Sequence, residues 1–233
     1  MTKNTKKSDA APLQAEANVG EIFSRSERFI ESYKKHILFA VLAIILIVVA
    51  ALAIHHGYYL PKEKEAQMAI YPGENYLANQ QWELALNGNG ADYSGFLSII
   101  DDYGITKTAT LAKAYAGICY YQLGQYEEAL KYLQKYNGSD KLVAPVTVGL
   151  IGDCYIETGK INEGINHFKK AADKAKSEII SPTYLRKAGT ACESQGNYTE
   201  ALKYYDEIKR LYPNSSEAGG IDKYIKRAEE RNK

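Results

Sequence analysis

The stretch GQYEEALKYLQKY, from Gly124 to Tyr136, decides how the chain folds because its spacing returns twice downstream. GKINEGINHFKKA begins at Gly159 and GNYTEALKYYDEI begins at Gly196. Each stretch opens with glycine, places a large apolar residue two positions later, and places a small residue five positions after the glycine. The apolar residues that follow at helical spacing predict a helix with one buried face. Helix propensity does not demand the same glycine three times, so the recurrence indicates a structural repeat.

A second glycine lies seven residues before each of these turns, and these glycines recur after 35 and 37 residues. We expect them to let the first helix of each unit lie directly against the second, because no side chain stands between the two backbones. The glycine that opens each quoted stretch is predicted to end the first helix in a left-handed conformation. The predicted packing residues are Gly117, Gly124, Tyr126, Ala129, Gly152, Gly159, Gly164, Gly189, Gly196, Tyr198, Ala201 and Pro213.

The combined pattern resembles the tetratricopeptide repeat, a helix–turn–helix unit of 34 residues that stacks into a solenoid. The resemblance covers Ala112 to about Pro213. It is incomplete, because lysine, valine and leucine stand at the usual tryptophan position, and Ile161 and Gly164 replace a tyrosine and an alanine. Gly164 is expected to cost its helix about 1 kcal/mol. The resemblance implies an all-α fold with repeats over residues 110–143, 145–179 and 182–215.

A degenerate first repeat is predicted upstream, over residues 62–109. NQQWELAL places Gln80, Trp82 and Ala85 where the opening stretch has its glycine, tyrosine and alanine. The next repeat follows about ten residues too late, and we assign the excess to a loop, NGNGADYSG, inserted into the second helix. The polar stretch over residues 217–233 is predicted to be a helix that caps the solenoid.

Residues Ile37 to Ile54 form a run of 18 without a polar side chain. At 1.5 Å per residue such a helix is about 27 Å long, close to the hydrocarbon thickness of a bilayer. Ala51-Leu52-Ala53 also fits the cleavage pattern of a signal peptide. The preceding 36 residues, however, contain five acids and an apolar pattern at helical spacing, which a signal peptide does not need. We therefore favour an uncleaved transmembrane helix over 37–54, after a disordered cytoplasmic tail over 1–18 and an amphipathic juxtamembrane helix over 19–36.

Flanking charge predicts the orientation of this anchor. Four basic residues lie shortly before the apolar run, whereas only Lys62 and Lys64 follow it within ten residues, each beside a glutamate. Lysine and arginine concentrate on the cytoplasmic side of membrane helices. We expect a cytoplasmic N-terminus and an exported repeat domain.

Cysteine and histidine offer few candidates for redox or metal chemistry. Cys119, Cys154 and Cys192 fall in the first helices of three successive repeats. Neighbouring helices pack about 8–10 Å apart, beyond the roughly 7 Å that a disulfide can bridge, so we predict free and largely buried thiols. His55 and His56 adjoin the apolar run, and we interpret them as interfacial polar residues rather than as a metal site.

Several classes of function are disfavoured by composition and motifs. The net charge of +1 gives no basic stripe for nucleic acid. We find no phosphate-binding glycine loop, no Cys-x-x-Cys and no His-Glu-x-x-His, so no cofactor, metal or small-molecule substrate is expected. The adjacent acids Asp101 and Asp102 would point to different faces of a helix and make a poor acid–base pair. We do not expect an enzyme.

A solenoid of this kind is expected to bind protein along its concave face, which the first helices of the repeats line. The alternative for each such residue is a solvated surface without a partner. The face lacks a basic cluster, which disfavours a clamp for a terminal carboxylate. The candidate partner-binding residues are Ala114, Ile118, Tyr121, Gln122, Asp153, Ile156, Glu157, Arg186, Thr190 and Glu193.

The order of short tail, single span and exported repeats resembles the YfgM-like family of bacterial membrane proteins, in its Bacteroidota-type members. The stretch PKEKEAQMAIYPGENYLANQQWELAL directly after the anchor adds to the resemblance. The resemblance implies an ancillary subunit of the Sec translocon in the inner membrane. Its partners would be translocon subunits, a membrane-anchored periplasmic chaperone, or exported chains.

A structural role is the competing hypothesis. IKRLYPNSSEAGGIDKYI resembles repeat ends of envelope assembly scaffolds, such as BamD-like and division-coordinating proteins. Those relatives are usually lipoproteins or soluble periplasmic proteins, and this sequence shows no lipobox cysteine. A scaffold would bind one fixed envelope complex, whereas a translocon accessory would bind chains during secretion.

Overall fold

The computed structural model describes the backbone of residues 11–233 and the side chains of residues 33–233. The described residues are helical and contain no β-strand. They form two compact units, one that ends at Tyr58 and one that runs from Tyr59 to Lys233. All-α architecture therefore holds for the described part of the chain.

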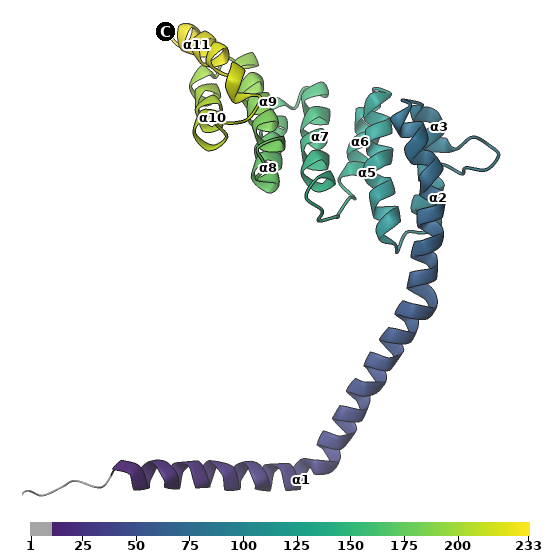
Figure 1. Cartoon of the computed structure of the whole chain (residues 1–233), viewed down its shortest axis with the longest axis vertical. Helices are drawn as coiled ribbons and strands as arrows, with labels where there is room; N and C mark the ends of the chain where they lie inside the picture. Colours follow the sequence, from purple (N-terminus) through teal and green to yellow (C-terminus); the bar gives the residue numbers. More distant parts are fainter. Residues whose placement is uncertain (1–10) are drawn as a thin grey trace, which may run out of the picture. The chain divides into compact units, whose positions relative to one another are not determined.

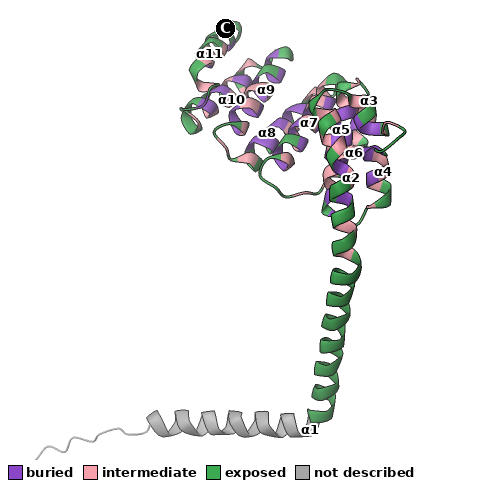
Figure 2. Ribbon diagram, turned by 45° about the vertical axis from the view of Figure 1, so that its right-hand side comes forward, coloured by how far each residue is buried: buried purple, intermediate pink, exposed green. Residues whose placement is uncertain are grey.

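The first unit contains one long helix, α1 (Ala11–Ile54), followed by a π-helical turn, η1 (His55–Tyr59). Side chains from Tyr33 to Tyr58 are all exposed, as the green ribbon of Figure 2 shows. An apolar helix of this length has the dimensions and composition of a membrane span. A core helix of a soluble protein would instead be buried.

The structure corrects part of the predicted tail over 1–18. Residues 11–18 already belong to α1, and α1 continues through the predicted juxtamembrane helix over 19–36 without a break. The segment has only one large apolar residue, Leu13, but its three alanines, with single leucine, glutamine and glutamate residues, favour a helix. Pro12 lies in the first turn, where its missing N–H costs nothing. Residues 1–10 lie outside the described part of the chain.

The second unit is a series of antiparallel helix pairs (Figure 1). We call the first member of each pair an A helix and the second a B helix. Each helix packs on its neighbours in sequence, and successive A helices also contact one another. The A helices are α2 (Leu60–Ala78), α5 (Lys107–Gln122), α7 (Val143–Glu157) and α9 (Ile180–Ser194); the B helices are α3 (Trp82–Asn87) with α4 (Phe96–Asp102), α6 (Tyr126–Leu133), α8 (Ile161–Ala175) and α10 (Tyr198–Leu211); η2 (Ala218–Gly220) and α11 (Asp222–Arg231) follow.

A left-handed residue ends each A helix. At the end of α5, Gly124 has φ +73°; its N–H donates to Tyr121 O at 3.0 Å, and Gln125 N–H donates to Tyr120 O at 2.9 Å. This pair of hydrogen bonds is a Schellman motif, which satisfies carbonyls that the helix end leaves open. The same two bonds close α7 and α9 at their equivalent glycines, which have φ +76° and +74°. The predicted role of these turn glycines is confirmed.

The first repeat uses the same turn without glycine. Gln80 has φ +58°, and the two hydrogen bonds are again present, from Gln80 N–H to Leu77 O and from Gln81 N–H to Tyr76 O. A left-handed conformation costs a residue with a Cβ about 1–2 kcal/mol.

We predict that Gln80→Gly stabilises the protein. Glycine removes the left-handed strain but loses more entropy on folding, so the net gain should be about 0.5–1 kcal/mol. Thermal unfolding followed by circular dichroism should show a rise in Tm of about 2–3 °C. The control is Gln80→Ala, which keeps the Cβ and should bring no rise. An equal gain from both variants would contradict the strain argument.

The other repeated glycine sets the distance between A and B helices. A Cβ built on Gly117 would lie 2.4 Å from the Leu133 side chain, and one on Gly152 would lie 2.8 Å from the Phe168 ring. Ala129 and Ala201 on the B helices are fully buried. The small residues therefore stand where helices approach most closely, as predicted.

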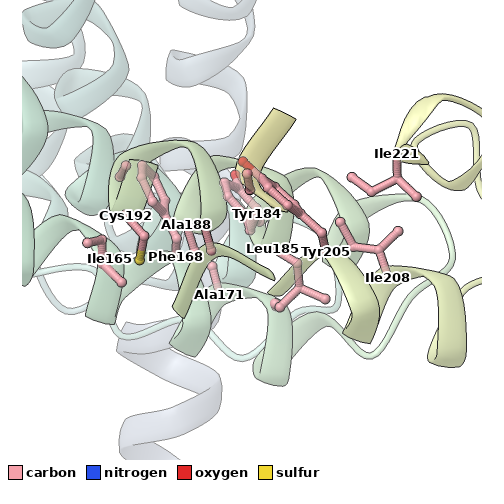
Figure 3. Packing of buried hydrophobic residues seen from close by; sticks show 14 residues of the cluster. Ile165, Phe168, Ala171, Tyr184, Leu185, Ala188, Cys192, Tyr205, Ile208 and Ile221 are labelled. Carbon is pink, nitrogen blue, oxygen red and sulfur yellow. The ribbon is translucent and has the colours of Figure 1, made fainter. Parts of the chain in front are cut away.

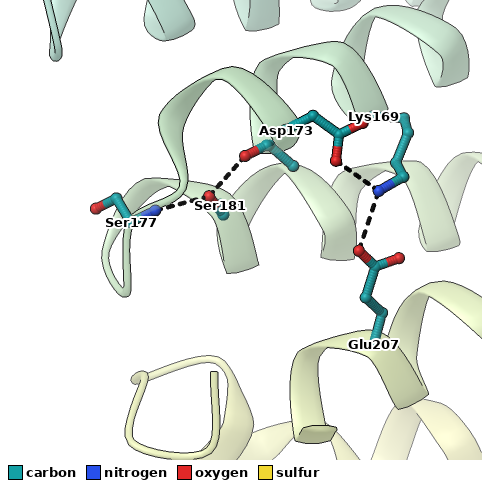
Figure 4. A network of polar contacts seen from close by, with 6 residues as sticks. Lys169, Asp173, Ser177, Ser181 and Glu207 are labelled. Carbon is teal, nitrogen blue, oxygen red and sulfur yellow. Dashed lines mark hydrogen bonds and ion pairs between the residues drawn. The ribbon is translucent and has the colours of Figure 1, made fainter. Parts of the chain in front are cut away.

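Three apolar cores hold the pairs together. The largest lies between α8, α9 and α10 and is closed from the C-terminal side by Ile221 (Figure 3). Tyr205 is fully buried within it, and its hydroxyl donates to Glu193 at 2.6 Å. Nearby, Lys169 Nζ on α8 bonds both Asp173 and Glu207, so that it bridges α8 to α10 (Figure 4). The C-terminal helix α11 covers the end of the solenoid with its own buried Ala228, and Ile221 just before it is also buried.

Two B helices depart from regular length. A loop over residues 88–95 separates α3 from α4, where the sequence places its insertion. Tyr93 anchors this loop, because its buried hydroxyl donates to Ala85 O at 2.7 Å. Helix α6 has only eight residues, whereas α8 has 15, and a loop follows α6 up to α7.

The cysteines behave as small apolar residues. Cys119, Cys154 and Cys192 are free and buried, as predicted. Burial raises the pKa of the Cys119 and Cys154 thiols to about 12 and that of Cys192 to about 11. The thiols are therefore protonated at neutral pH and unreactive while the protein is folded.

Candidate protein-binding groove on the A helices

Two hollows lie side by side along helix α7, one against α5 and one against α9. Val146, Leu150 and Asp153 line them at positions i, i+4 and i+7 of α7, so that one face of α7 serves both. We call the two hollows together the A-helix groove. The groove lies on the A helices, where the candidate partner-binding residues also lie.

The α7–α9 pocket has a volume of about 280 Å³. Four of the ten candidate residues line it: Asp153 and Ile156 from α7, and Arg186 and Thr190 from α9. Phe168 of α8 forms part of the apolar wall. The structure therefore brings together residues that are up to 37 positions apart in the sequence.

An ion pair crosses this pocket. Lys187 Nζ on α9 lies 2.8 and 2.7 Å from the two carboxylate oxygens of Asp153 on α7. The same ammonium group lies over the Phe168 ring at 5.6 Å and over the Tyr184 ring at 5.8 Å. Burial raises the pKa of the Asp153 carboxyl, and Lys187 offsets this only in part. The pair ties two A helices together and leaves a partly desolvated charge within the pocket.

The α5–α7 pocket is apolar and has a volume of about 180 Å³. Ile118 is the one predicted residue that lines it. The residues that the sequence did not single out are Tyr115, Leu142, Val143, Val146, Thr147, Leu150 and Ile180. Val146 could have been found, because it lies one helical turn before Gly149, the residue equivalent to Ala114 and Arg186.

Three candidates, Tyr121, Gln122 and Glu157, lie at the C-terminal ends of α5 and α7. Tyr121 is half-buried, with its ring 5.6 Å from that of Tyr126. Burial and the nearby Asp153 and Glu157 carboxylates raise the pKa of Tyr121 to about 12. Gln122 and Glu157 are exposed. These residues can contact a partner that continues past the two pockets.

Two of the ten candidates need correction. Ala114 is fully buried, so it offers no surface to a partner. Glu193 is 8% exposed and already engaged: Arg227 of α11 donates to both carboxylate oxygens at 2.8 and 2.9 Å. Glu193 therefore holds the C-terminal helix in place, a role that only the tertiary structure reveals.

A larger hollow of about 520 Å³ opens beside the α5–α7 pocket and shares Tyr115 and Val143 with it. It lies where the short helix α6 gives way to a loop. Tyr136 and Asp140 of that loop, which are hydrogen-bonded to each other, form part of its rim. The apolar part of the groove thus extends toward the beginning of α5.

In the part of the chain with described side chains, no three His, Cys, Asp or Glu side chains gather as metal ligands. The adjacent His55 and His56 rings are 5.3 Å apart, and His56 Nδ1 lies 3.1 Å from Leu52 O.

Two family models match the helix pairs of the second unit. The model described as anaphase-promoting complex, cyclosome, subunit 3 matches residues 105–171, and the tetratricopeptide repeat model matches residues 182–215. Residues 182–215 therefore match a tetratricopeptide repeat directly, within a solenoid of helix pairs of the same kind. The second match has the same bounds as the last repeat predicted from the glycine spacing. No curated protein sequence matches the chain.

Solved structures agree on the fold. The nearly identical TPR-like repeats of a Podosopora anserina protein, described as a kinesin light chain, are similar to this chain with a TM-score of 0.56 and 12% sequence identity. The similarity covers 72% of this chain and 87% of that one. A single-substitution form of the same protein has the same TM-score and identity, and 86% of its length is covered. At this identity the likeness shows a shared solenoid fold. Tetratricopeptide repeats typically serve as non-enzymatic scaffolds for protein–protein interaction.

Proposed function

We propose that this protein is an inner-membrane-anchored module that binds exported polypeptides beside the Sec translocon, with its repeats in the periplasm. The observation that carries the proposal is the A-helix groove in a chain whose preceding apolar run, over residues 37–54, is exposed along its whole length. The flanking charges and the YfgM-like layout support the orientation and the setting.

The groove offers two kinds of contact to an extended peptide. The α5–α7 pocket can take an aliphatic or aromatic side chain between Ile118 and Val146. The α7–α9 pocket offers the Arg186 guanidinium and the paired Asp153 and Lys187 to polar groups of the peptide. Pockets of this size predict weak binding to many peptide sequences. The membrane anchor would offset this weak affinity, because it raises the effective concentration of the groove near polypeptides that leave the translocon.

Photo-crosslinking in cells tests the proposal. A crosslinking amino acid at Tyr121 or Arg186 of the full chain should capture exported polypeptides or translocon subunits while secretion is active. The same amino acid at Asn166, an exposed position on α8, is the control. Capture of one fixed envelope complex, unchanged when secretion is blocked, would instead favour the scaffold. Capture of neither class would contradict both.

We predict that Val146→Asp lowers capture at Arg186 about tenfold. The substitution places a carboxylate in the apolar α5–α7 pocket, and loss of one aliphatic contact of about 1.4 kcal/mol corresponds to a tenfold change in affinity. Val146 is 38% exposed, so the domain should still fold. The matched control is Asn166→Asp, which adds the same charge away from the groove and should leave capture unchanged.

A further inference from the structure

Each loop that leads into an A helix of the last three repeats carries one large aliphatic side chain in water. Ile105 precedes α5, Leu142 precedes α7 and Ile179 precedes α9, and their exposed fractions are 56%, 68% and 81%. A lysine lies within three residues of each, at Lys107, Lys141 and Lys176. Single exposed aliphatic residues are common on protein surfaces, but one at every such repeat junction is a pattern.

These three tips lie along one edge of the solenoid. Lys107 and Thr110 of α5 line one hollow together with the loop over 137–140. Leu142 and Ile180 line another hollow together. The loop before α5 and the loop before α7 are seen at the same end of their helices in Figure 1. We call this edge, with Ile105, Leu142 and Ile179, the loop edge.

The chain enters the solenoid at the same edge. Near the start of α2, Lys62 Nζ donates to Asp102 O at 3.0 Å. Glu63 accepts a hydrogen bond from Lys107 N–H at 2.8 Å and one from the Thr108 hydroxyl at 2.7 Å. Hydrogen bonds to the carboxylate lower the pKa of Glu63 against the effect of burial, so the group stays charged at neutral pH. The start of α2 is therefore fixed beside the loop that carries Ile105.

Chain length then limits how far the loop edge can lie from the membrane. Leu60 follows Ile54, the end of the apolar run, by six positions, and even a fully extended chain spans only about 20 Å over that length. The turns at the opposite edge lie one A helix away from the loop edge, about 24 Å for the 16 residues of α5. Of the two edges, only the loop edge includes the start of α2, the point that the chain keeps within this distance of the apolar run.

We propose that the loop edge rests on the bilayer surface and inserts its three aliphatic tips among the lipid headgroups. This inference rests on the proposed anchor. The lysines beside the tips can extend their stems along the interface and reach phosphate groups. Asp101, Asp102 and Glu178 also lie near this edge, so attachment depends on the aliphatic tips more than on net charge. The bilayer would then hold the groove in a defined orientation at the membrane surface.

Spin labels on the full chain in protein-free lipid nanodiscs test the inference. Single labels go on the tips (Ile105→Cys, Leu142→Cys, Ile179→Cys) and, as matched controls, on exposed turns of the opposite edge (Gln125→Cys, Lys160→Cys, Gln195→Cys). The native cysteines are buried and should not take the label. Nanodiscs contain zwitterionic and anionic phospholipids, and the readout is accessibility to oxygen relative to a water-soluble nickel chelate. We expect a ratio several-fold higher at the tips than at the turns.

A label at Leu46, in the middle of the apolar run, distinguishes failure of this inference from failure of the proposed membrane anchor. If Leu46 lies in lipid and the tips match the turns, the loop edge does not touch the bilayer and the inference is overturned while the anchor stands. The same result would mean that the tips are free for a protein partner. If Leu46 also matches the turns, the proposed anchor fails and this inference fails with it. Replacing Ile105 and Ile179 by serine should lower the ratio at a Leu142 label, because the tips insert together.

Discussion

Replacing Gly189 by valine should destabilise the protein more than any other single change considered, by about 3 kcal/mol, the upper end for overpacking a core. A Cβ built on Gly189 would lie 2.3 Å from Tyr205 Cε1, well inside van der Waals contact. The ring cannot swing aside cheaply, because Tyr205 is fully buried and its hydroxyl is hydrogen-bonded to Glu193. Denaturant unfolding followed by circular dichroism measures the loss.

Two further variants define this test. Gly219→Val introduces the same side chain where no atom lies within 4 Å, and it should change the free energy of unfolding by about 0.5 kcal/mol or less. In the double variant Gly189→Val/Tyr205→Leu, the smaller leucine should make room for valine, so that the loss is less than the sum of the two single effects. Strict additivity would show that the two residues do not collide.

Replacing Arg227 by methionine should also destabilise the protein, because the buried Glu193 carboxylate then has no cationic partner. Removing one partner of a buried ion pair costs about 3–5 kcal/mol, and because the Arg227 side chain is 43% exposed we expect about 2 kcal/mol. The control, Lys203→Met, breaks an exposed pair with Glu200 on α10 and should cost well under 1 kcal/mol.

The pH dependence of this effect follows from the pKa of Glu193. Burial alone would raise that pKa, but hydrogen bonds from Arg227 and Tyr205 outweigh burial and hold it below its ordinary value of 4.5. A carboxyl with a lowered folded pKa contributes stability that is complete above its ordinary pKa and is lost as the pH falls through the folded pKa. The stabilities of the wild type and Arg227→Met should therefore converge in acid. A difference that persists unchanged below pH 4.5 would mean that the Arg227 side chain acts through packing alone.

Much of the fold is readable from the sequence because it depends on contacts within one helix pair. Gly124 ends a helix whatever surrounds it, since only the local backbone conformation is involved. Gly189 and its counterparts are readable for a related reason: the A and B helices of a pair are close in sequence and joined by a short turn. The apolar run before Leu60 is readable from length and composition alone.

The candidate site was only partly predictable. Repeat alignment found Asp153, Ile156, Arg186 and Thr190, which the structure places around one pocket. It could not show that Ala114 is fully buried, or that Arg227, 34 residues further along the chain, binds the Glu193 carboxylate. Nor could it show that α6 ends at Leu133 and opens a hollow beside Tyr115.

The sequence by itself therefore determined the repeat, its turns and the apolar helix that precedes it. The tertiary structure alone decided which side chains of the A helices remain free for a partner. The physical reason is that turn conformation and helix periodicity depend on residues a few positions apart, whereas burial and ion pairing depend on whatever the fold brings close. Glu193 illustrates the difference, because its position on α9 follows from periodicity but its partner comes from the C-terminal helix.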